Sequence, residues 1–225
     1  SSSQHGEAIR LYEQYVKDYP VPLDRNIEAQ NKLIMLYKGQ KNQERVTYWT
    51  VQMADSVNKA GAQATPRMRY LGAQASFTLA EPQFARFQAI KLKQPLKDTL
   101  AAKRNAMDEA LKAYQRTANF AVAEYTTAAN HQIGELYRVL ADDLLHSERP
   151  PGLSDEAKEE YELVLEEQAN PFENQAISFF ETNTQRTKDN IYDEWVKKSF
   201  ESLSKLQPGR YDKAERVEDS INVSY

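Results

Sequence analysis

The chain has 225 residues, of which 40% are hydrophobic and 28% charged, and its net charge at pH 7 is -4. This apolar content is too high for a disordered chain, and 7 glycines with 9 prolines are too few for the many turns of an all-β protein. No apolar run approaches the roughly 18 residues of a membrane span. The absence of cysteine excludes disulfides, thiol catalysis and cysteine-bound zinc.

A helical period of 3.6 residues runs along almost the whole chain, and no segment shows the sustained alternation of a strand. The first third of the chain predicts four helices: one around residues 8–16 that ends before Pro20, then 27–38, then 45–58, and a fourth that opens at Thr65-Pro66. Threonine is a favoured helix cap and proline is tolerated in a first helical turn, so we expect Thr65 to cap this fourth helix.

The middle of the chain predicts longer helices. After Pro82 the helical pattern covers residues 83–119, and Pro95 should divide it into a short helix and a long one. Another long helix is predicted at 120–146. The segment 147–154 contains Pro150-Pro151-Gly152 and is the clearest break in the sequence, so we predict a hinge there.

Three further helices are predicted after this break, at about 155–169, 172–188 and 191–206. Ser154 should cap the first of them, because its acidic first turn suits the positive end of a helix. Residues 211–225 are expected to form a polar tail or a link to further sequence. Because the chain starts at Ser1 without a methionine, we expect it to be a piece of a longer protein.

A series of consecutive helices is typical of proteins built from internal repeats. The series Ala8, Tyr12, Pro20 and the pairs Leu71-Gly72 and Ile133-Gly134 resemble the key positions of tetratricopeptide repeats, in which the glycine lets two helices approach closely. The resemblance implies an all-α, right-handed solenoid of helical hairpins with about ten to twelve helices, enlarged in its centre. It also implies one continuous unit over residues 1–210 and a role in binding other proteins.

The C-terminal part carries a second resemblance. The segments 165–173 and 195–199 and the run Pro208-Gly209-Arg210-Tyr211 are similar to the ends of large bacterial repeat proteins. Some of these proteins accompany envelope machines of the TonB–ExbB–ExbD type or of gliding motility. This resemblance implies an adaptor in a bacterial envelope assembly and favours the periplasm over the cytoplasm.

Catalytic motifs are missing from the sequence. His5, His131 and His146 are too far apart for a paired metal site, and the sequence contains neither a glycine-rich phosphate loop nor a Gly-x-Ser-x-Gly motif. We therefore expect a protein that is not an enzyme and that needs no cofactor and no metal.

Tyrosine is the residue type that most suggests a binding surface. Most of the 13 tyrosines are expected between helices, with the hydroxyl at the rim. Tyr48, Tyr70 and Tyr125 fall outside the repeat frame, so we predict that they line the concave face of the solenoid and contact a protein partner.

Charge is distributed unevenly. Residues 83–107 carry six basic residues and one acid, together with Phe84 and Phe87, which raises the alternatives of nucleic-acid or membrane-surface binding; we expect neither. Residues 142–167 have a net charge of -8. Solvated helix faces explain both segments. The alternative for the acidic one is a docking surface for a basic partner, centred on Glu159, Glu162 and Glu166.

The sequence is compatible with three classes of function. The first is a non-catalytic scaffold or adaptor that binds a protein partner. The second is a structural spacer whose contacts are mainly with its own neighbouring repeats, and the third is a helical module that binds a small ligand or a polymer through its tyrosines. Nucleic acid is not an expected partner.

Overall fold

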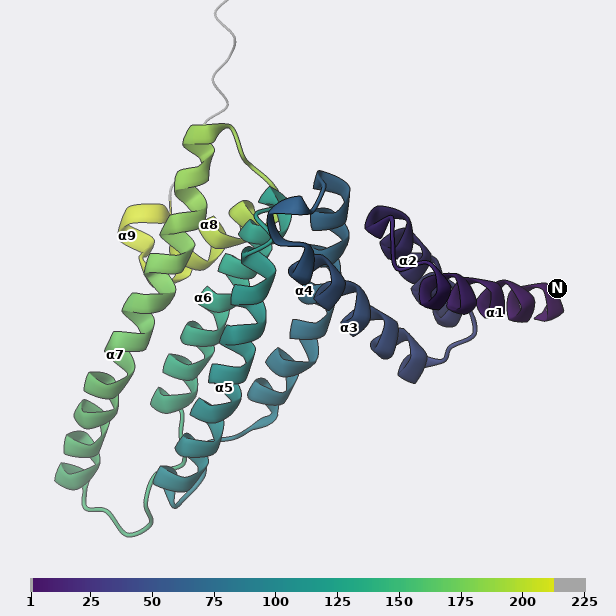
Figure 1. The fold of residues 1–225 in the computed structure, drawn as a ribbon. Helices are drawn as coiled ribbons and strands as arrows, with labels where there is room; N and C mark the ends of the chain where they lie inside the picture. The colour runs from purple at the N-terminus through teal and green to yellow at the C-terminus, as the bar shows by residue number, and fades with distance from the viewer. Residues whose placement is uncertain (1, 213–225) are drawn as a thin grey trace, which may run out of the picture.

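The computed structural model describes residues 2–212 and contains helices and loops, with no strand in this range. The α-helices are α1 (Ser2–Asp18), α2 (Leu23–Gly39), α3 (Gln43–Ala60), α4 (Pro66–Ala89), α5 (Leu96–Ala118), α6 (Ala123–Leu145), α7 (Asp155–Gln185), α8 (Glu194–Leu206) and α9 (Pro208–Tyr211). Two short 3-10 helices, Gly61–Gln63 and Arg186–Asp189, follow α3 and α7. The helices succeed one another in chain order across the molecule (Figure 1). The protein is thus an all-α helical solenoid.

The helix starts that the sequence predicts are present. The hydroxyl of Thr65 accepts a hydrogen bond from the backbone N–H of Met68 at 3.2 Å, and the hydroxyl of Ser154 accepts one from the N–H of Ala157 at 3.2 Å. Pro95 directly precedes α5. Each of these residues satisfies or removes a backbone N–H that a helix start leaves unpaired.

Two predicted helix breaks are absent, because Pro82 and Pro171 lie inside α4 and α7. A proline in a helix interior removes one hydrogen bond and costs about 3 kcal/mol. Here both prolines are exposed, and buried residues on either side, such as Ala169 and Ala176, hold both halves of the helix in the core. The helix therefore continues through each proline. The resulting α4 to α7 have 23 to 31 residues, against 17 or 18 in α1 to α3, so the predicted enlargement of the centre is present.

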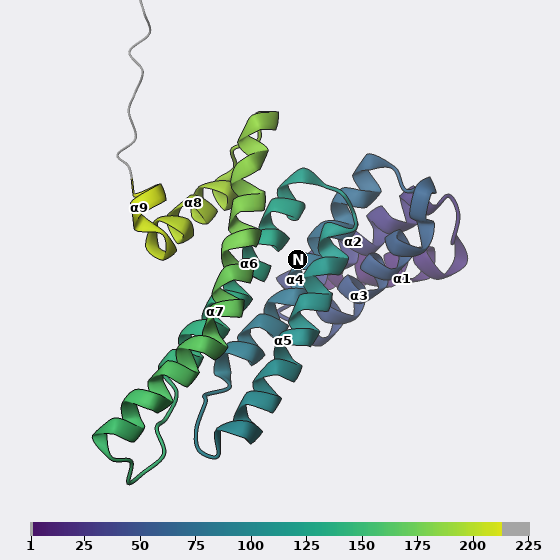
Figure 2. The ribbon, with the colours of Figure 1, turned by 90° about the vertical axis from the view of Figure 1, so that its left-hand side faces the viewer.

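The helices are arranged in two layers. Each helix packs against its neighbours in sequence, and α2 also contacts α4, α4 contacts α6, and α6 contacts α8. Across the described residues, α1, α3, α5 and α7 make no comparable contact with one another. The helices of a curved row approach most closely on its concave side, so the even-numbered helices form the inner layer. Figure 2 shows the long helices α4 to α7 from a second direction.

Two glycines allow helices to meet at close range. A Cβ atom on Gly72 would lie 2.7 Å from the ring of Phe120 and 2.8 Å from a methyl group of Val57. A Cβ on Gly134 would lie 2.5 Å from the ring of Phe180. The close approach predicted at these two glycines is confirmed, since each one admits a buried side chain from another element.

The predicted hinge segment 147–154 connects α6 to α7, two helices that pack along each other. Its backbone is tied to the loop between α4 and α5: the N–H of Glu148 donates to the carbonyl of Leu92 at 3.2 Å, and the side-chain amide of Gln94 donates to the carbonyl of Glu148 at 2.7 Å. The hinge stays a prediction, and its opening would break these bonds.

The first residue of the predicted tail is part of a helix. Tyr211 belongs to α9, and its hydroxyl donates a hydrogen bond to Glu181 at 2.9 Å. Residues 213–225, the remainder of the predicted tail, lie outside the described residues.

Candidate functional site

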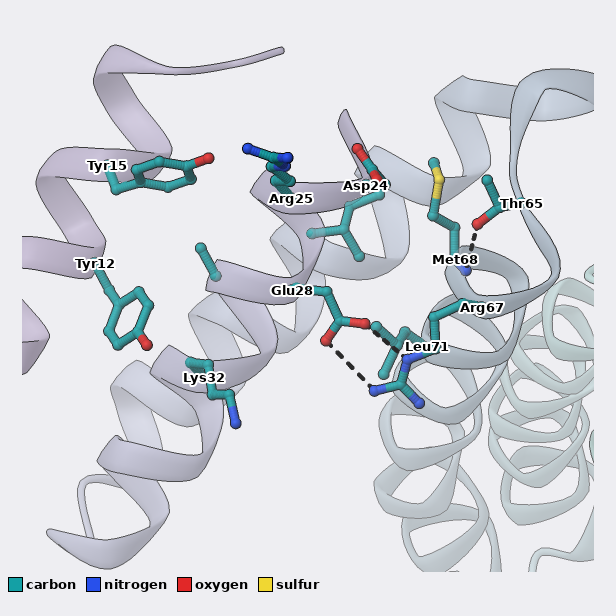
Figure 3. Close-up of a pocket in the computed structure, with 12 residues that line it drawn as sticks. Tyr12, Tyr15, Asp24, Arg25, Glu28, Lys32, Thr65, Arg67, Met68 and Leu71 are labelled. Carbon is teal, nitrogen blue, oxygen red and sulfur yellow. Dashed lines mark hydrogen bonds and ion pairs between the residues drawn. The ribbon is translucent and has the colours of Figure 1, made fainter. Parts of the chain in front are cut away.

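A hollow of about 420 Å³ opens between α1, α2 and α4. Figure 3 shows the residues that line it. They are Tyr12 and Tyr15 from α1; Asp24, Arg25, Ile27, Glu28, Ala29 and Lys32 from α2; Thr65, before α4; and Arg67, Met68 and Leu71 from α4. We call this hollow the N-terminal groove. It lies beside the inner layer, where α2 contacts α4.

The floor of the N-terminal groove is apolar because the lining side chains also belong to the core. Ile27, Met68 and Leu71 are buried, and they pack in one cluster with the helices α1 to α4. Tyr12 and Tyr15 are half-buried and stand on the opposite wall. Aromatic rings above an apolar floor, with hydroxyls at the rim, are typical of surfaces that bind peptides or small ligands.

An ion pair crosses the groove between Glu28 of α2 and Arg67 of α4. The Nε of Arg67 lies 2.7 Å from one carboxylate oxygen of Glu28, and an Nη lies 3.4 Å from the other (Figure 3). The hydrogen bond from Arg67 lowers the pKa of the Glu28 carboxyl from its ordinary value. This two-point contact neutralises the acid in the middle of the groove.

Three further charged side chains lie on the rim of the groove, and one of them, Lys32, also lowers the pKa of the Glu28 carboxyl through its charge. Asp24, Arg25 and Lys32 are exposed, and none of them forms an ion pair within residues 2–212. Arg25, Glu28 and Lys32 are spaced i, i+3 and i+7 along α2 and therefore share one helix face. Since Arg67 already pairs with Glu28, the two cations are available to an acidic group outside the chain.

Two of the predicted tyrosines lie together beside this groove. The rings of Tyr70 on α4 and Tyr125 on α6 meet edge to face, with centroids 5.5 Å apart. The guanidinium of Arg67 lies 5.9 Å from the Tyr70 ring centre, which connects the pair to the groove. Burial and contact with Tyr70 raise the pKa of the Tyr125 hydroxyl. Both tyrosines are half-buried on inner-layer helices.

Tyr48 lies elsewhere, on α3, and its ring is partly exposed. The guanidinium of Arg45 lies 4.9 Å from the ring centre of Tyr48 and 5.3 Å from that of Tyr37. Arg45 also pairs with Glu13 of α1. These contacts join α1, α2 and α3, so the structure supplies Tyr48 with a partner within the chain and does not bring it to the groove.

The predicted acids lie on α7, far along the chain from the groove. Glu159, Glu162 and Glu166 are exposed. Glu162 lies 3.8 Å from Arg149, whereas Glu159 and Glu166 form no ion pair within the described range. The structure therefore separates the candidate residues into three groups: Tyr70 with Tyr125, Tyr48, and the acids of α7.

The basic segment 83–107 contributes part of its side chains to the core. Phe87 and Leu92 are buried, and Lys103 is fully buried. Phe87 and Leu92 are therefore not available to a nucleic acid or a membrane, whereas the other five basic side chains of the segment are exposed.

A second, polar hollow of about 260 Å³ lies between α6 and α8. In its wall, Arg138 donates hydrogen bonds to both carboxylate oxygens of Glu135, and Ser202 donates another at 3.1 Å. His131 is buried beside them. Glu135, Arg138 and Ser202 thus bond to one another, whereas His131 contacts Ser199 of α8.

Sequence reasoning missed the residues that make the N-terminal groove. Tyr12 was interpreted as a key position of the first repeat, and the shared face of Arg25, Glu28 and Lys32 is the local signal for the groove. The partner of Glu28 lies 39 positions away on another helix, and no local pattern indicates that contact.

Within residues 2–212, no group of three or more histidine, aspartate and glutamate side chains is placed to hold a metal ion. No helix of the same range has both the length and the apolar character that crossing a bilayer requires. No protein-family model matches the chain, and neither curated proteins nor solved structures give a significant match.

Proposed function

We propose that the protein is a non-catalytic interaction scaffold that holds a segment of a partner protein in the N-terminal groove. The observation that carries this proposal is the combination, in one hollow, of an apolar floor, two tyrosines and two unpaired cations. Apolar and aromatic area supplies binding energy, and unpaired charges at the rim supply orientation and specificity.

The chemistry of the groove suggests the partner segment. One or two apolar side chains would cover Met68 and Leu71, and an acidic group would approach Arg25 and Lys32. A small ligand is the second candidate, because about 420 Å³ falls within the usual range of ligand pockets. A protein segment is favoured because Tyr70 and Tyr125 extend the aromatic surface along the inner layer, beyond the reach of a small molecule.

The resemblance to tetratricopeptide repeats belongs to the same proposal. The glycine contacts of α4 and α6 support it, because close helix approach is the role of glycine in that repeat. The adaptor role in a bacterial envelope assembly, and the periplasmic location, rest on the sequence resemblance alone. The spacer, with contacts mainly to its own neighbouring repeats, is the competing function.

Site-specific photo-crosslinking in cells tests the scaffold. A benzoylphenylalanine replaces Tyr15 in the groove wall and, as a matched control, the exposed Tyr192 after α7. We expect a defined protein adduct from position 15 that position 192 does not give. Arg25→Glu combined with Lys32→Glu should abolish it, because both cations that face the partner are reversed.

The outcomes separate the candidate functions. Adducts only to the same chain would favour the spacer. No adduct from position 15, together with a ligand that raises the melting temperature in a thermal-shift screen, would favour the small-ligand module. Adducts that persist in the double variant would show that the groove is not the binding site.

A further inference from the structure

One end of the molecule brings two loops together that are far apart in sequence. The α4–α5 loop and the α6–α7 loop both lie at the lower end of the molecule in the two ribbon views (Figures 1 and 2). The backbone N–H of Gln94 donates to the carboxylate of Glu148 at 2.9 Å, in addition to the bonds described above. These contacts fix the start of α5 and the start of α7 at the same end of the fold.

The first half of α7 presents an acidic face at this end. Asp155 pairs with Lys158 and Glu162 with Arg149. Five further acids of this stretch are exposed and form no ion pair within the described residues: Glu156, Glu159, Glu160, Glu166 and Glu167. We call these five residues the acidic face. Their charge is unneutralised by the fold, so an outside partner can neutralise it.

An exposed apolar pair lies within the acidic face. Leu163 and Val164 are 61% and 43% exposed, although the opposite side of the same helix is buried through Leu165 and Ala169. α7 packs most extensively on α6 and also contacts α8, and Tyr161 in its first half lies 3.5 Å from the side-chain amide of Gln94. Leu163 and Val164 therefore form a small apolar patch with acidic side chains around it.

A basic corner lies at the same end of the molecule. Lys91, Lys93 and Lys97 are exposed, in the α4–α5 loop and the first turn of α5, and none of them forms an ion pair in residues 2–212. Asp98 is the acid nearest to them in sequence. Glu148 also lies here, since its carboxylate accepts the N–H of Gln94, so the corner keeps an excess of basic over acidic side chains. The chain therefore carries an acidic patch and a smaller basic patch at one end.

We propose that a second copy of the chain docks at this end, with the acidic face of each copy against the basic corner of the other. A two-fold axis lets one pair of patches form two equivalent contacts, which is the arrangement of most homodimers. Leu163 and Val164 would be covered in the same contact. A foreign basic segment could satisfy the acidic face alone, but it would leave the three lysines unpaired.

Analytical ultracentrifugation of the full chain tests this proposal. At about 0.05 M salt we expect the average mass to rise with concentration towards that of a dimer, and at about 0.5 M salt we expect at least tenfold weaker association because exposed charges are screened. Two variants are compared: one with Glu159→Lys, Glu160→Lys and Glu166→Lys, the other with Lys91→Glu, Lys93→Glu and Lys97→Glu. Each variant alone should associate at least tenfold more weakly.

Mixing the two variants gives the decisive measurement. In the mixture, every acidic patch of one variant can face a basic patch of the other, so a heterodimer should form at wild-type strength. All substituted side chains are exposed, and circular dichroism of each variant checks that the fold is unchanged.

Three results would overturn the proposal. They are a wild-type chain that stays monomeric at low salt, a dimer that neither variant weakens, and a mixture that remains monomeric. A monomeric chain that binds polylysine through the acidic face would assign the surface to a foreign basic partner instead. The groove variant Arg25→Glu with Lys32→Glu should dimerise normally, which separates this test from that of the proposed function.

Discussion

At the scale of single residues, a buried charge replaces part of the predicted basic surface. The ammonium of Lys103 lies 2.8 Å from the carbonyl oxygen of Ile90, 3.0 Å from that of Phe87 and 2.5 Å from the carboxylate of Asp143. Its three hydrogens thus have three oxygen partners, two at the end of α4 and one on α6. Sequence alone counts Lys103 as a surface cation, because its acceptors come from distant elements. A fully buried lysine is tolerated only with such complete pairing.

A buried tyrosine gives the first prediction at this scale. Tyr114 is fully buried, and its hydroxyl has no hydrogen-bond partner within the described structure. Burial raises the pKa of this hydroxyl, so it stays neutral at ordinary pH. Tyr114→Phe removes an unsatisfied hydroxyl, loses no hydrogen bond and keeps the packing of the ring. The free energy of unfolding should therefore stay unchanged or rise by up to about 1 kcal/mol. Urea unfolding measures the difference.

Tyr37→Phe is the matched control. The hydroxyl of Tyr37 donates to the carboxylate of Glu13 at 2.8 Å, so its loss should destabilise the protein by about 1 kcal/mol. If Tyr114→Phe were as destabilising as this control, the Tyr114 hydroxyl would have an unrecognised partner, such as a buried water.

At the scale of elements, local signals predicted most helices and misplaced two breaks. The caps Thr65 and Ser154 and the helix start after Pro95 depend on neighbours within a few residues, so the sequence reveals them. Pro82 and Pro171 have the same local signal as Pro95. Whether a helix tolerates its proline depends on the burial gained by continuing it, and that burial comes from helices distant in sequence.

The packing of α6 against α7 gives the second prediction. Gly134→Ala would place a methyl group 2.5 Å from the ring of Phe180, which is fully buried and has no room to move. Overpacking of this kind costs about 1–3 kcal/mol, so the melting temperature should fall. Gly6→Ala in α1 meets nothing within 4 Å and should be neutral or slightly stabilising, because alanine favours helix. Equal melting temperatures for the two variants would contradict the close contact.

At the scale of the whole molecule, the sequence predicts the solenoid but does not predict which residues from different helices lie together on its surface. Periodicity gives the helices, and short connections make sequential helices neighbours. Tyr70 and Tyr125 were chosen by their position around their helices relative to the repeat pattern. The two residues do lie together, although they are 55 positions apart. The same reasoning grouped Tyr48 with them, because phase reports which side of its helix a residue occupies and carries no information on which other helix covers that side.

Stability in such a molecule is local, because most contacts join neighbouring helices. The core is correspondingly divided into clusters: one over α1 to α4, one over α4 to α7, and a small one over the C-terminal helices. A perturbation confined to the last helices should therefore unfold them before α1 to α3. Acid provides such a perturbation, through a buried histidine.

His131 on α6 is held neutral between α7 and α8. The hydroxyl of Ser199 donates to the carbonyl of Trp195 at 2.8 Å, so the Nδ1–H of His131 donates to the Ser199 oxygen at 3.1 Å. Asn183 of α7 donates to the same oxygen at 3.1 Å. Burial lowers the pKa of His131 to about 4 from its ordinary 6.5, against the opposing charge of Glu135.

The last prediction follows from the sign of this shift. The unfolded chain binds a proton at His131 near pH 6.5, and the folded chain binds it only near pH 4. The free energy of unfolding is therefore unaffected by this group above pH 6.5 and decreases as the pH falls from 6.5 to 4. At pH 4.5 the loss should be about 2–3 kcal/mol. Hydrogen exchange from pH 7 to 4.5, corrected for intrinsic rates, should show protection lost first in α6, α7 and α8 and retained in α1 to α3. His131→Gln should abolish the difference, and the exposed His146→Gln should keep it. A uniform loss along the chain would show that the solenoid unfolds as a single cooperative unit.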